Sequence, residues 1–285
     1  MDWRSLRWID RYNVKEKKFY HYPKIETNTV FRIKKWTENE VFFITEKGLM
    51  LYDSKTDSIL NQDKALEKIS KDLSFTKDIS SFSYKPITAL MVDNQRNLWV
   101  GTKSALYLVE QTKAFKNLQL INTADNKPLG GDVSSIVTDK EGNVWVGYFD
   151  AVIDVFDKTG STRIKRYTCY SETNKINNYP GIGSIQALHE AKDGKIWIGS
   201  FIGGLYQYDP STTLFTYIPL DQRDVNHLGK HDVRGISSDS HGNIWVALHG
   251  GGLSCYNPNT KEITRYRADY ANWQTSLQEN WLISV

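Results

Sequence analysis

Proline, cysteine and long apolar runs are all scarce in this sequence. Among its 285 residues only 7 are Pro and 2 are Cys. Cys169 and Cys255 stand alone, which excludes a disulfide framework and a cysteine-based metal motif. No stretch approaches the roughly 18 apolar residues of a membrane-spanning helix. Residues 1–5 lack the basic-then-apolar order of a signal peptide. We therefore expect no direct membrane insertion and no targeting signal in the sequence as given.

Neither sign of charge dominates the sequence. There are 36 Lys and Arg against 33 Asp and Glu, which gives a net charge of +3. The basic residues are scattered, whereas nucleic-acid-binding domains concentrate them on one face. We therefore expect no nucleic-acid partner. Hydrophobic residues make up 40% of the chain and charged residues 24%, a balance that excludes a disordered tail, a collagen-like chain and a coiled coil.

Aromatic residues are abundant, and four of the 9 tryptophans are regularly spaced. Trp99, Trp145, Trp197 and Trp245 lie 46, 52 and 48 residues apart. Apolar residues stand twelve and nine positions before each of them. An Asp usually stands six positions before the Trp, and a Gly three before and two after. The exceptions are Ala191 for Asp, and Arg96 and Ala247 for Gly. Such a register identifies an internal repeat.

Each repeat is expected to form four short strands. The first contains the apolar pair, the second surrounds the Trp, the third is a Gly-Leu-x-x-Tyr run such as residues 204–208, and the fourth is an aromatic run such as residues 215–217. The Asp-x-x-Gly-Asn segment between the first two strands is typical of a tight turn. Four strands in a period of roughly 40–50 residues indicate an all-β fold, the β-propeller, in which each repeat is one blade.

The two ends of the chain resemble incomplete repeats. Phe42 takes the Trp position in a degenerate first copy, and Leu282 and Val285 have the spacing of a first apolar pair. We predict one propeller domain over residues 1–285 with about six blades, or a fragment of a larger propeller. The expected blades are 1–24 with 276–285, 25–84, 85–130, 131–180, 181–230 and 231–275. Residues 282–285 would then close the ring against the N-terminal half-copy.

One segment departs from the strand pattern. Leu66, Ile69 and Leu73 have helical spacing within residues 62–73. We predict a short surface helix there, inserted between two blades.

The repeat resembles that of the two-component-regulator propeller family. The pattern is carried most clearly by residues 139–147, 203–209 and 239–245. In that family, many such repeats form the extracytoplasmic part of hybrid two-component sensors of Bacteroidetes, which typically detect breakdown products of complex polysaccharides. The resemblance implies signal transduction through a following immunoglobulin-like domain and a membrane helix to a histidine kinase. It also implies a periplasmic location, and that the chain is a piece of a larger protein.

The repeated Asp and Trp residues are expected to be structural. Asp93, Asp139 and Asp239 occupy the same turn in different blades, whereas glycoside hydrolysis needs two carboxyl groups about 5–10 Å apart across one bond. The four Trp side chains are expected to fill the spaces between blades. No catalytic residue, metal site or cofactor is predicted, because no nucleophile–base pair, converging histidines or phosphate-binding loop stands out.

Function is expected where the repeats differ, in the connection between the second and third strands and in the links between blades. There, aromatic rings would pack on a sugar while polar groups bind its hydroxyls. The candidate ligand-binding residues are Lys103, Tyr148, Phe149, Asp150, Tyr179, Phe201, His231 and His249.

Three functions remain open at this point. The first is a sensor propeller with an oligosaccharide ligand, which would make this segment no enzyme. The second is a lyase or hydrolase built on a propeller. Streptogramin lyases, for example, have repeats that resemble these. The third is a structural or dimerisation platform, a homodimer for example, for which Trp36, Trp273 and Trp281 would be available.

Overall fold

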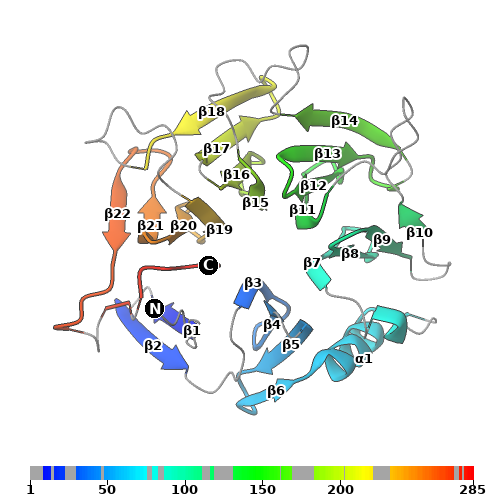
Figure 1. Ribbon diagram of the computed structural model, residues 1–285, viewed down its shortest axis with the longest axis horizontal. Helices are drawn as coiled ribbons and strands as arrows, with labels where there is room; N and C mark the ends of the chain where they lie inside the picture. Colours follow the sequence, from blue (N-terminus) through cyan, green and yellow to red (C-terminus); the bar gives the residue numbers. More distant parts are fainter. Residues whose placement is uncertain are drawn as a thin grey trace.

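The computed structural model of the protein forms blades arranged around a centre (Figure 1). It describes residues 9–13, 16–22, 30–45, 48–75, 79–82, 87–110, 116–118, 131–160, 162–168, 183–201, 203–220, 232–272, 276–277 and 279–285.

Five sheets of four antiparallel strands make up the ring, each a simple meander. The first contains β3 (Val30–Lys35), β4 (Glu40–Thr45), β5 (Gly48–Asp53) and β6 (Ser58–Leu60). The second contains β7 (Ile87–Val92), β8 (Leu98–Thr102), β9 (Leu106–Val109) and β10 (Lys116–Leu118). The third contains β11 (Val133–Thr138), β12 (Val144–Tyr148), β13 (Val152–Phe156) and β14 (Arg163–Thr168). The fourth contains β15 (Ile185–Glu190), β16 (Ile196–Ser200), β17 (Gly204–Asp209) and β18 (Leu214–Ile218). The fifth contains β19 (Asp232–Ser238), β20 (Ile244–His249), β21 (Gly252–Tyr256) and β22 (Ile263–Tyr266).

The β-propeller fold is confirmed, but the expected number of blades is wrong. The described residues form five four-stranded blades rather than about six. β1 (Ile9–Asn13) and β2 (Lys18–Tyr22) make a separate two-stranded sheet. The C-terminal residues contribute isolated bridges rather than a strand, because they pair with their neighbours at single points only.

A closing segment, residues 279–285, links the last four-stranded blade to the first. The amide of Leu282 donates to the carbonyl of Leu248 at 3.1 Å, and Ser284 Oγ accepts the amide of Ile33 at 3.0 Å. In the third and fourth blades, Ser135 Oγ accepts the amide of Leu188 in the same way, at 3.0 Å. Ser284 thus takes the place that a first-strand serine has elsewhere, as the spacing of Leu282 and Val285 indicates, and Figure 1 shows the C-terminus at the centre of the ring.

The repeated Asp residues are structural, as predicted, and they anchor the tryptophans as well as the turns. In the second blade Asp93 Oδ1 accepts the backbone amide of Asn97 at 2.9 Å, and Asp93 Oδ2 accepts the indole N–H of Trp99 at 2.9 Å. Asp139 and Asp239 bind Trp145 and Trp245 in the same way, at 2.9 and 3.1 Å. All four tryptophans of the series are buried. A carboxylate engaged in this way is structural.

The fourth blade lacks the hydrogen bond from Trp to Asp. A substitution there tests how much this bond contributes to stability. Ala191 stands where the second, third and fifth blades have Asp, and Trp197 Nε1 is buried without a hydrogen-bond partner among the described residues. We expect Ala191→Asp to raise the free energy of unfolding by about 1 kcal/mol, because it satisfies the buried indole N–H. The reverse change in the second blade, Asp93→Ala, should lower the free energy of unfolding by about 1–3 kcal/mol. Urea unfolding of both variants checks the pair, and destabilisation by Ala191→Asp would contradict the account.

Glycine two positions after the Trp allows adjacent blades to approach. A Cβ on Gly199 would lie 2.4 Å from Cγ1 of Val233, the first apolar residue of the next inner strand. Gly101 and Gly147 face Val133 and Ile185 in the same way. The repeated glycine and the repeated apolar residue are therefore two halves of one contact between blades.

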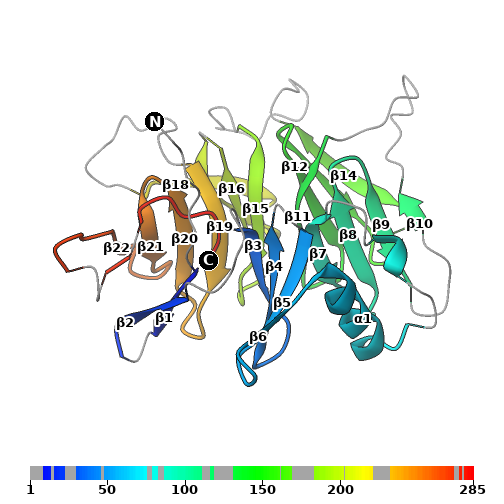
Figure 2. The same cartoon turned by 60° about the horizontal axis from the view of Figure 1, so that its bottom comes forward.

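The predicted helix is confirmed as α1 (Gln62–Asp72), followed by the 3₁₀ turn η1 (Ser80–Phe82). The side chain of Asn61 caps its N-terminus by accepting the amide of Lys64. Ala65, Leu66 and Ile69 are buried in the apolar cluster shared by the first two blades. Figure 2 shows α1 lying against the first blade, outside the inner strands.

Candidate ligand-binding site

The inner strands β3, β7, β11, β15 and β19 share a distortion at their first residues. In each strand the pairing register shifts across one residue near the start of the strand, which leaves one bulged residue per blade. A bulge twists the strand locally and redirects a side chain. The bulged residues are Phe31, Thr88, Ser134, Gln186 and Arg234. They surround one end of the ring, which we call the mouth, and they differ in every blade.

Arg32 ties three blades together beneath the mouth. Its guanidinium donates to the carbonyl of Phe31 at 2.6 Å, to that of Ser134 at 3.2 Å and to that of Gln186. Burial, with a smaller contribution from the charge of Arg234, lowers the pKa of Arg32 to about 10. Arg32 stays a cation at neutral pH, and its three carbonyl contacts give it a positioning role.

Arg234 is the centre of a cluster on one side of the mouth. Its Nε and Nη2 donate to Asp232 Oδ2 at 2.8 and 2.6 Å, and its Nη1 donates to Gln186 Oε1 at 3.3 Å. The guanidinium also lies over the ring of Phe201, with 5.3 Å from Cζ to the ring centroid. Three different segments thus hold one cation in a fixed orientation.

His249 and Trp281 extend this cluster outward. His249 Nδ1 is 3.6 Å from Asp232 Oδ2, and its ring meets that of Trp281 edge-on at a centroid distance of 4.4 Å. Burial lowers the pKa of His249, the charge of Arg234 lowers it further, and Asp232 opposes this. His249 is therefore neutral at pH 7 and offers both a donor and an acceptor. We call Gln186, Phe201, Asp232, Arg234, His249 and Trp281 the mouth cluster.

The mouth cluster has the properties of a recognition site. Phe201 is 38% exposed and Trp281 43% exposed, so two aromatic rings face solvent beside a charged network. Asp232 is buried, and its Oδ1 has no hydrogen-bond partner within the described part of the chain. An unpaired buried carboxylate oxygen is costly unless something donates to it. The cluster thus combines apolar faces with unused hydrogen-bonding capacity.

The described residues show neither a metal cluster nor a membrane-spanning helix. No group of three or more His, Cys, Asp or Glu side chains is arranged there to hold a metal ion. In the same residues, no helix has the length and apolarity to cross a membrane.

Two segments of the sequence match a known repeat family. A family model described as "Two component regulator propeller" matches residues 81–104 and 128–150. The matched segments contain β7 and β8 of the second blade and β11 and β12 of the third. No curated protein matches the sequence.

Solved structures share the propeller fold. The extracellular domain of a hybrid two component system from B. thetaiotaomicron has a TM-score of 0.59 and 17% identity, with 99% of this chain and 34% of that chain covered. A second such domain from B. thetaiotaomicron has a TM-score of 0.54 and 21% identity, with 92% of this chain and 32% of that chain covered. A protein of unknown function from Bacteroides caccae has a TM-score of 0.58 and 11% identity, with 98% of this chain and 94% of that chain covered. This chain spans about a third of the length of the first two, and at these identities the likeness shows the fold.

The propeller brings together only some of the predicted site residues. Phe201 and His249 meet in the mouth cluster through Arg234 and Asp232. Phe149 is 39% exposed but lies on the neighbouring blade. Asp150 Oδ2 accepts the amide of Gly131 at 3.0 Å and so fastens its own loop. Lys103 is exposed in the β8–β9 turn.

Tyr148 requires a correction. The side chain is 1% exposed, and burial beside the charge of Asp154 raises its pKa. Tyr148 is the last residue of β12, where its side chain points into the blade, so the structure does not offer it to a ligand. Tyr179 and His231 lie outside the described residues.

Sequence reasoning missed Gln186, Asp232, Arg234 and Trp281. The signal for Arg234 and Gln186 was present, because the position after the first apolar residue carries a different side chain in each repeat. Trp281 carried no such signal, since its place beside His249 depends on the closing segment reaching the fifth blade.

Proposed function

We propose that the chain is the ligand-sensing propeller of a hybrid two-component sensor and that its mouth cluster binds an oligosaccharide. The segment itself would bind and not catalyse, and it would lie on the periplasmic side of the membrane. The family match and the extracellular location of similar solved domains support the sensor part of the proposal. The kinase and immunoglobulin-like domains that such a sensor needs would belong to the same protein or to a partner.

One observation supports a sugar as the ligand. Phe201 and Trp281 expose aromatic surface on either side of a network formed by Asp232, Arg234 and His249. Sugars have apolar faces that pack on aromatic rings and hydroxyl groups that bind charged and amide side chains. The neutral His249 ring, which is partly exposed, supplies a directional partner for hydroxyl groups.

Calorimetric titration with a panel of oligosaccharides tests the proposal. We expect at least one glycan to bind, and Phe201→Ala to weaken it about tenfold or more, which corresponds to about 1.4 kcal/mol. Leu214→Ala is the matched control, because Leu214 is an exposed apolar residue on the outermost strand of the same blade. A folded protein that binds no glycan, or a Phe201→Ala variant with full affinity, would refute this assignment.

A further inference from the structure

A concavity lies at the opposite end of the ring from the mouth. Its volume is about 610 Å³, and it is lined by residues 34–37, the last turn of α1, β7 and the turn after β7. The mouth surrounds Phe31 at the start of β3, whereas this groove begins at Lys34 near the end of that strand. The volume lies within the range of small-molecule sites. We call it the α1 groove.

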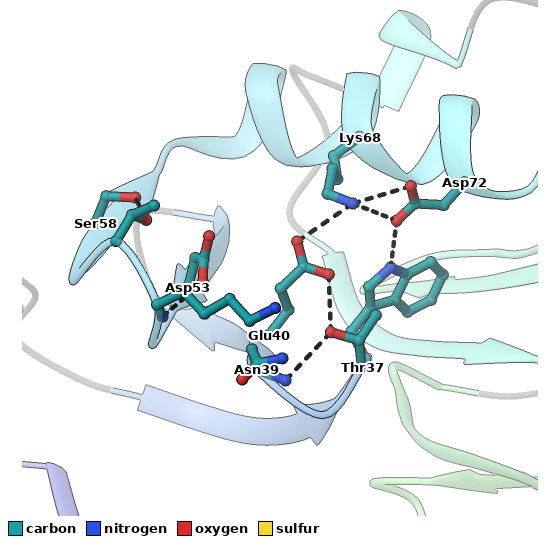
Figure 3. A network of polar contacts seen from close by, with 10 residues as sticks. Thr37, Asn39, Glu40, Asp53, Ser58, Lys68 and Asp72 are labelled. Atoms are coloured by element: carbon teal, nitrogen blue, oxygen red, sulfur yellow. Dashed lines mark hydrogen bonds and ion pairs between the residues drawn. The ribbon is translucent and has the colours of Figure 1, made fainter.

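The α1 groove is lined by more positive than negative charge. Lys34, Lys35, Lys68 and Arg96 contribute four cations, and Asp72 is the one carboxylate among the lining residues. Lys68 is already neutralised, because its Nζ lies 2.7 Å from Asp72 Oδ2 and 3.2 Å from Glu40 Oε1. Figure 3 shows Lys68 held between these two carboxylates.

The other cations keep their charge available. Lys34 has no acidic partner among the described residues. It retains contact with solvent through the groove, while the surrounding protein lowers its pKa by desolvation. Within the part of the chain that the structure describes, Lys35 approaches one carboxylate, that of Glu38 at 3.8 Å, and both side chains are largely exposed. Such an exposed pair contributes little. An anion entering the groove would therefore meet cations that no carboxylate neutralises strongly.

Arg96 occupies a backbone position that favours glycine. Its φ is 64°, and Gly142, Gly194 and Gly242 fill the equivalent turn positions with φ of 85°, 85° and 83°. A non-glycine residue is strained in this region. Arg96 Nη2 donates to the carbonyl of Asp72 at the end of α1, 2.8 Å away, which places its guanidinium at the groove. Residues held in such strain cluster at functional sites.

The groove is assembled from departures from the repeat. Lys34 occupies the position of Met91, Val137, His189 and Ser237 in the other four inner strands. Arg96 replaces the turn glycine, and α1, in the link between the first two blades, is the one α-helix within the described residues. In a repeat protein the shared positions build the fold, so positions that differ are where binding resides. Three independent departures converge on this one concavity.

The groove also has an apolar wall. Leu90 and Met91 are nearly buried beneath it, and Trp36 stands at its edge. Trp36 Nε1 donates to Asp72 Oδ2 at 2.7 Å, and its ring packs edge-on against Phe42 at 5.0 Å. The indole is thus fixed in orientation, and its polar atom is already satisfied. What remains for a ligand is apolar surface next to positive charge.

We propose that the α1 groove binds a small organic anion, with its carboxylate or sulfate between Lys34, Lys35 and Arg96 and its apolar part against Trp36 and Met91. This site lies apart from the mouth cluster and goes beyond the proposed function. Its charge and its apolar wall favour an anion with a ring or hydrocarbon body over a free inorganic ion.

Binding is measured by NMR titration of the folded protein with benzoate, glucuronate, glucose and sulfate at low ionic strength. We expect benzoate or glucuronate to shift the resonances of Trp36 and Arg96, more strongly than sulfate, and glucose to leave them unchanged. Added salt should weaken the binding, because the attraction is between charges. No shift with either organic anion, or an equal shift with glucose, overturns the proposal.

Two variants separate binding from structure. Lys34→Met introduces the residue found at the same place in the next blade, and Arg96→Gly introduces the glycine of the other blades. Each should weaken the organic anion about fivefold or more, while the melting temperature of the free protein stays within a few degrees of the parent. If Arg96→Gly lowers stability and leaves binding unchanged, Arg96 only caps α1 and the proposal fails. Phe201→Ala, at the mouth, should not affect this binding.

Discussion

Removal of residues 280–285 is expected to lower the melting temperature by roughly 10 °C. The deletion removes the hydrogen bonds from Gly252 N to Asn280 O, from Leu282 N to Leu248 O and from Ile33 N to Ser284 Oγ. It also uncovers Leu277 and Leu253, which form an apolar cluster with Leu282 and Val285. Together these losses amount to about 3–5 kcal/mol, and 1 kcal/mol corresponds to about 2–4 °C for a domain of this size.

A matched pair of serine variants shows whether closure is responsible. Ser284→Ala removes the contact with Ile33, and Ser135→Ala removes the equivalent contact with Leu188. If the closing segment acts as a first-strand equivalent, both variants should lose about 1 kcal/mol. Thermal unfolding followed by circular dichroism measures all three variants. A deletion that leaves the melting temperature unchanged would show that the ring does not depend on this segment.

Arg166→Leu is expected to cost about 3 kcal/mol of stability. Asp154 is fully buried on β13, and Arg166 on the adjacent strand donates to both of its carboxylate oxygens, at 2.7 and 2.6 Å. Without Arg166 the one cationic partner left to Asp154 among the described residues is Arg163, whose Nε lies 3.8 Å away. Breaking a buried ion pair from one side typically costs about 3–5 kcal/mol, and Arg163 places the expected loss at the lower end.

The double variant Asp154→Leu with Arg166→Leu is the control. Replacing both members of a buried pair with apolar residues is often neutral, because no uncompensated charge remains. We expect the double variant to recover most of the stability that Arg166→Leu loses. Guanidinium unfolding of the parent, the two single variants and the double variant gives the coupling energy. Equal destabilisation by the single and double variants would show that packing, rather than the unpaired charge, dominates.

The sequence was sufficient to predict the propeller because its repeat encodes the contacts within and between blades. The Asp-to-Trp hydrogen bond lies within one turn and strand, and the contact of Gly199 with Val233 joins consecutive repeats. Helical spacing likewise predicted α1. The number of blades was wrong because β1, β2 and the closing segment carry parts of the repeat without forming a four-stranded sheet.

The candidate site was less predictable, because it depends on side chains that meet across blades. Phe201 and His249 were predicted as members of variable loops, yet Arg234 and Asp232 bring them together. Tyr148 occupies the same connection as Phe149 but faces inward. Trp281 reaches the mouth only through the closing segment. Spacing along the chain identifies the variable positions and does not reveal which of them point toward one another.

We propose above all that the mouth cluster recognises a sugar. The most direct measurement is an NMR titration of the folded protein with the tightest-binding oligosaccharide, followed at the Trp281 indole, the His249 ring and the Phe201 ring. The account predicts saturable shifts at all three, abolished together in Phe201→Ala and retained in Leu214→Ala. Shifts confined to other parts of the ring, or no shift with any oligosaccharide, would contradict it.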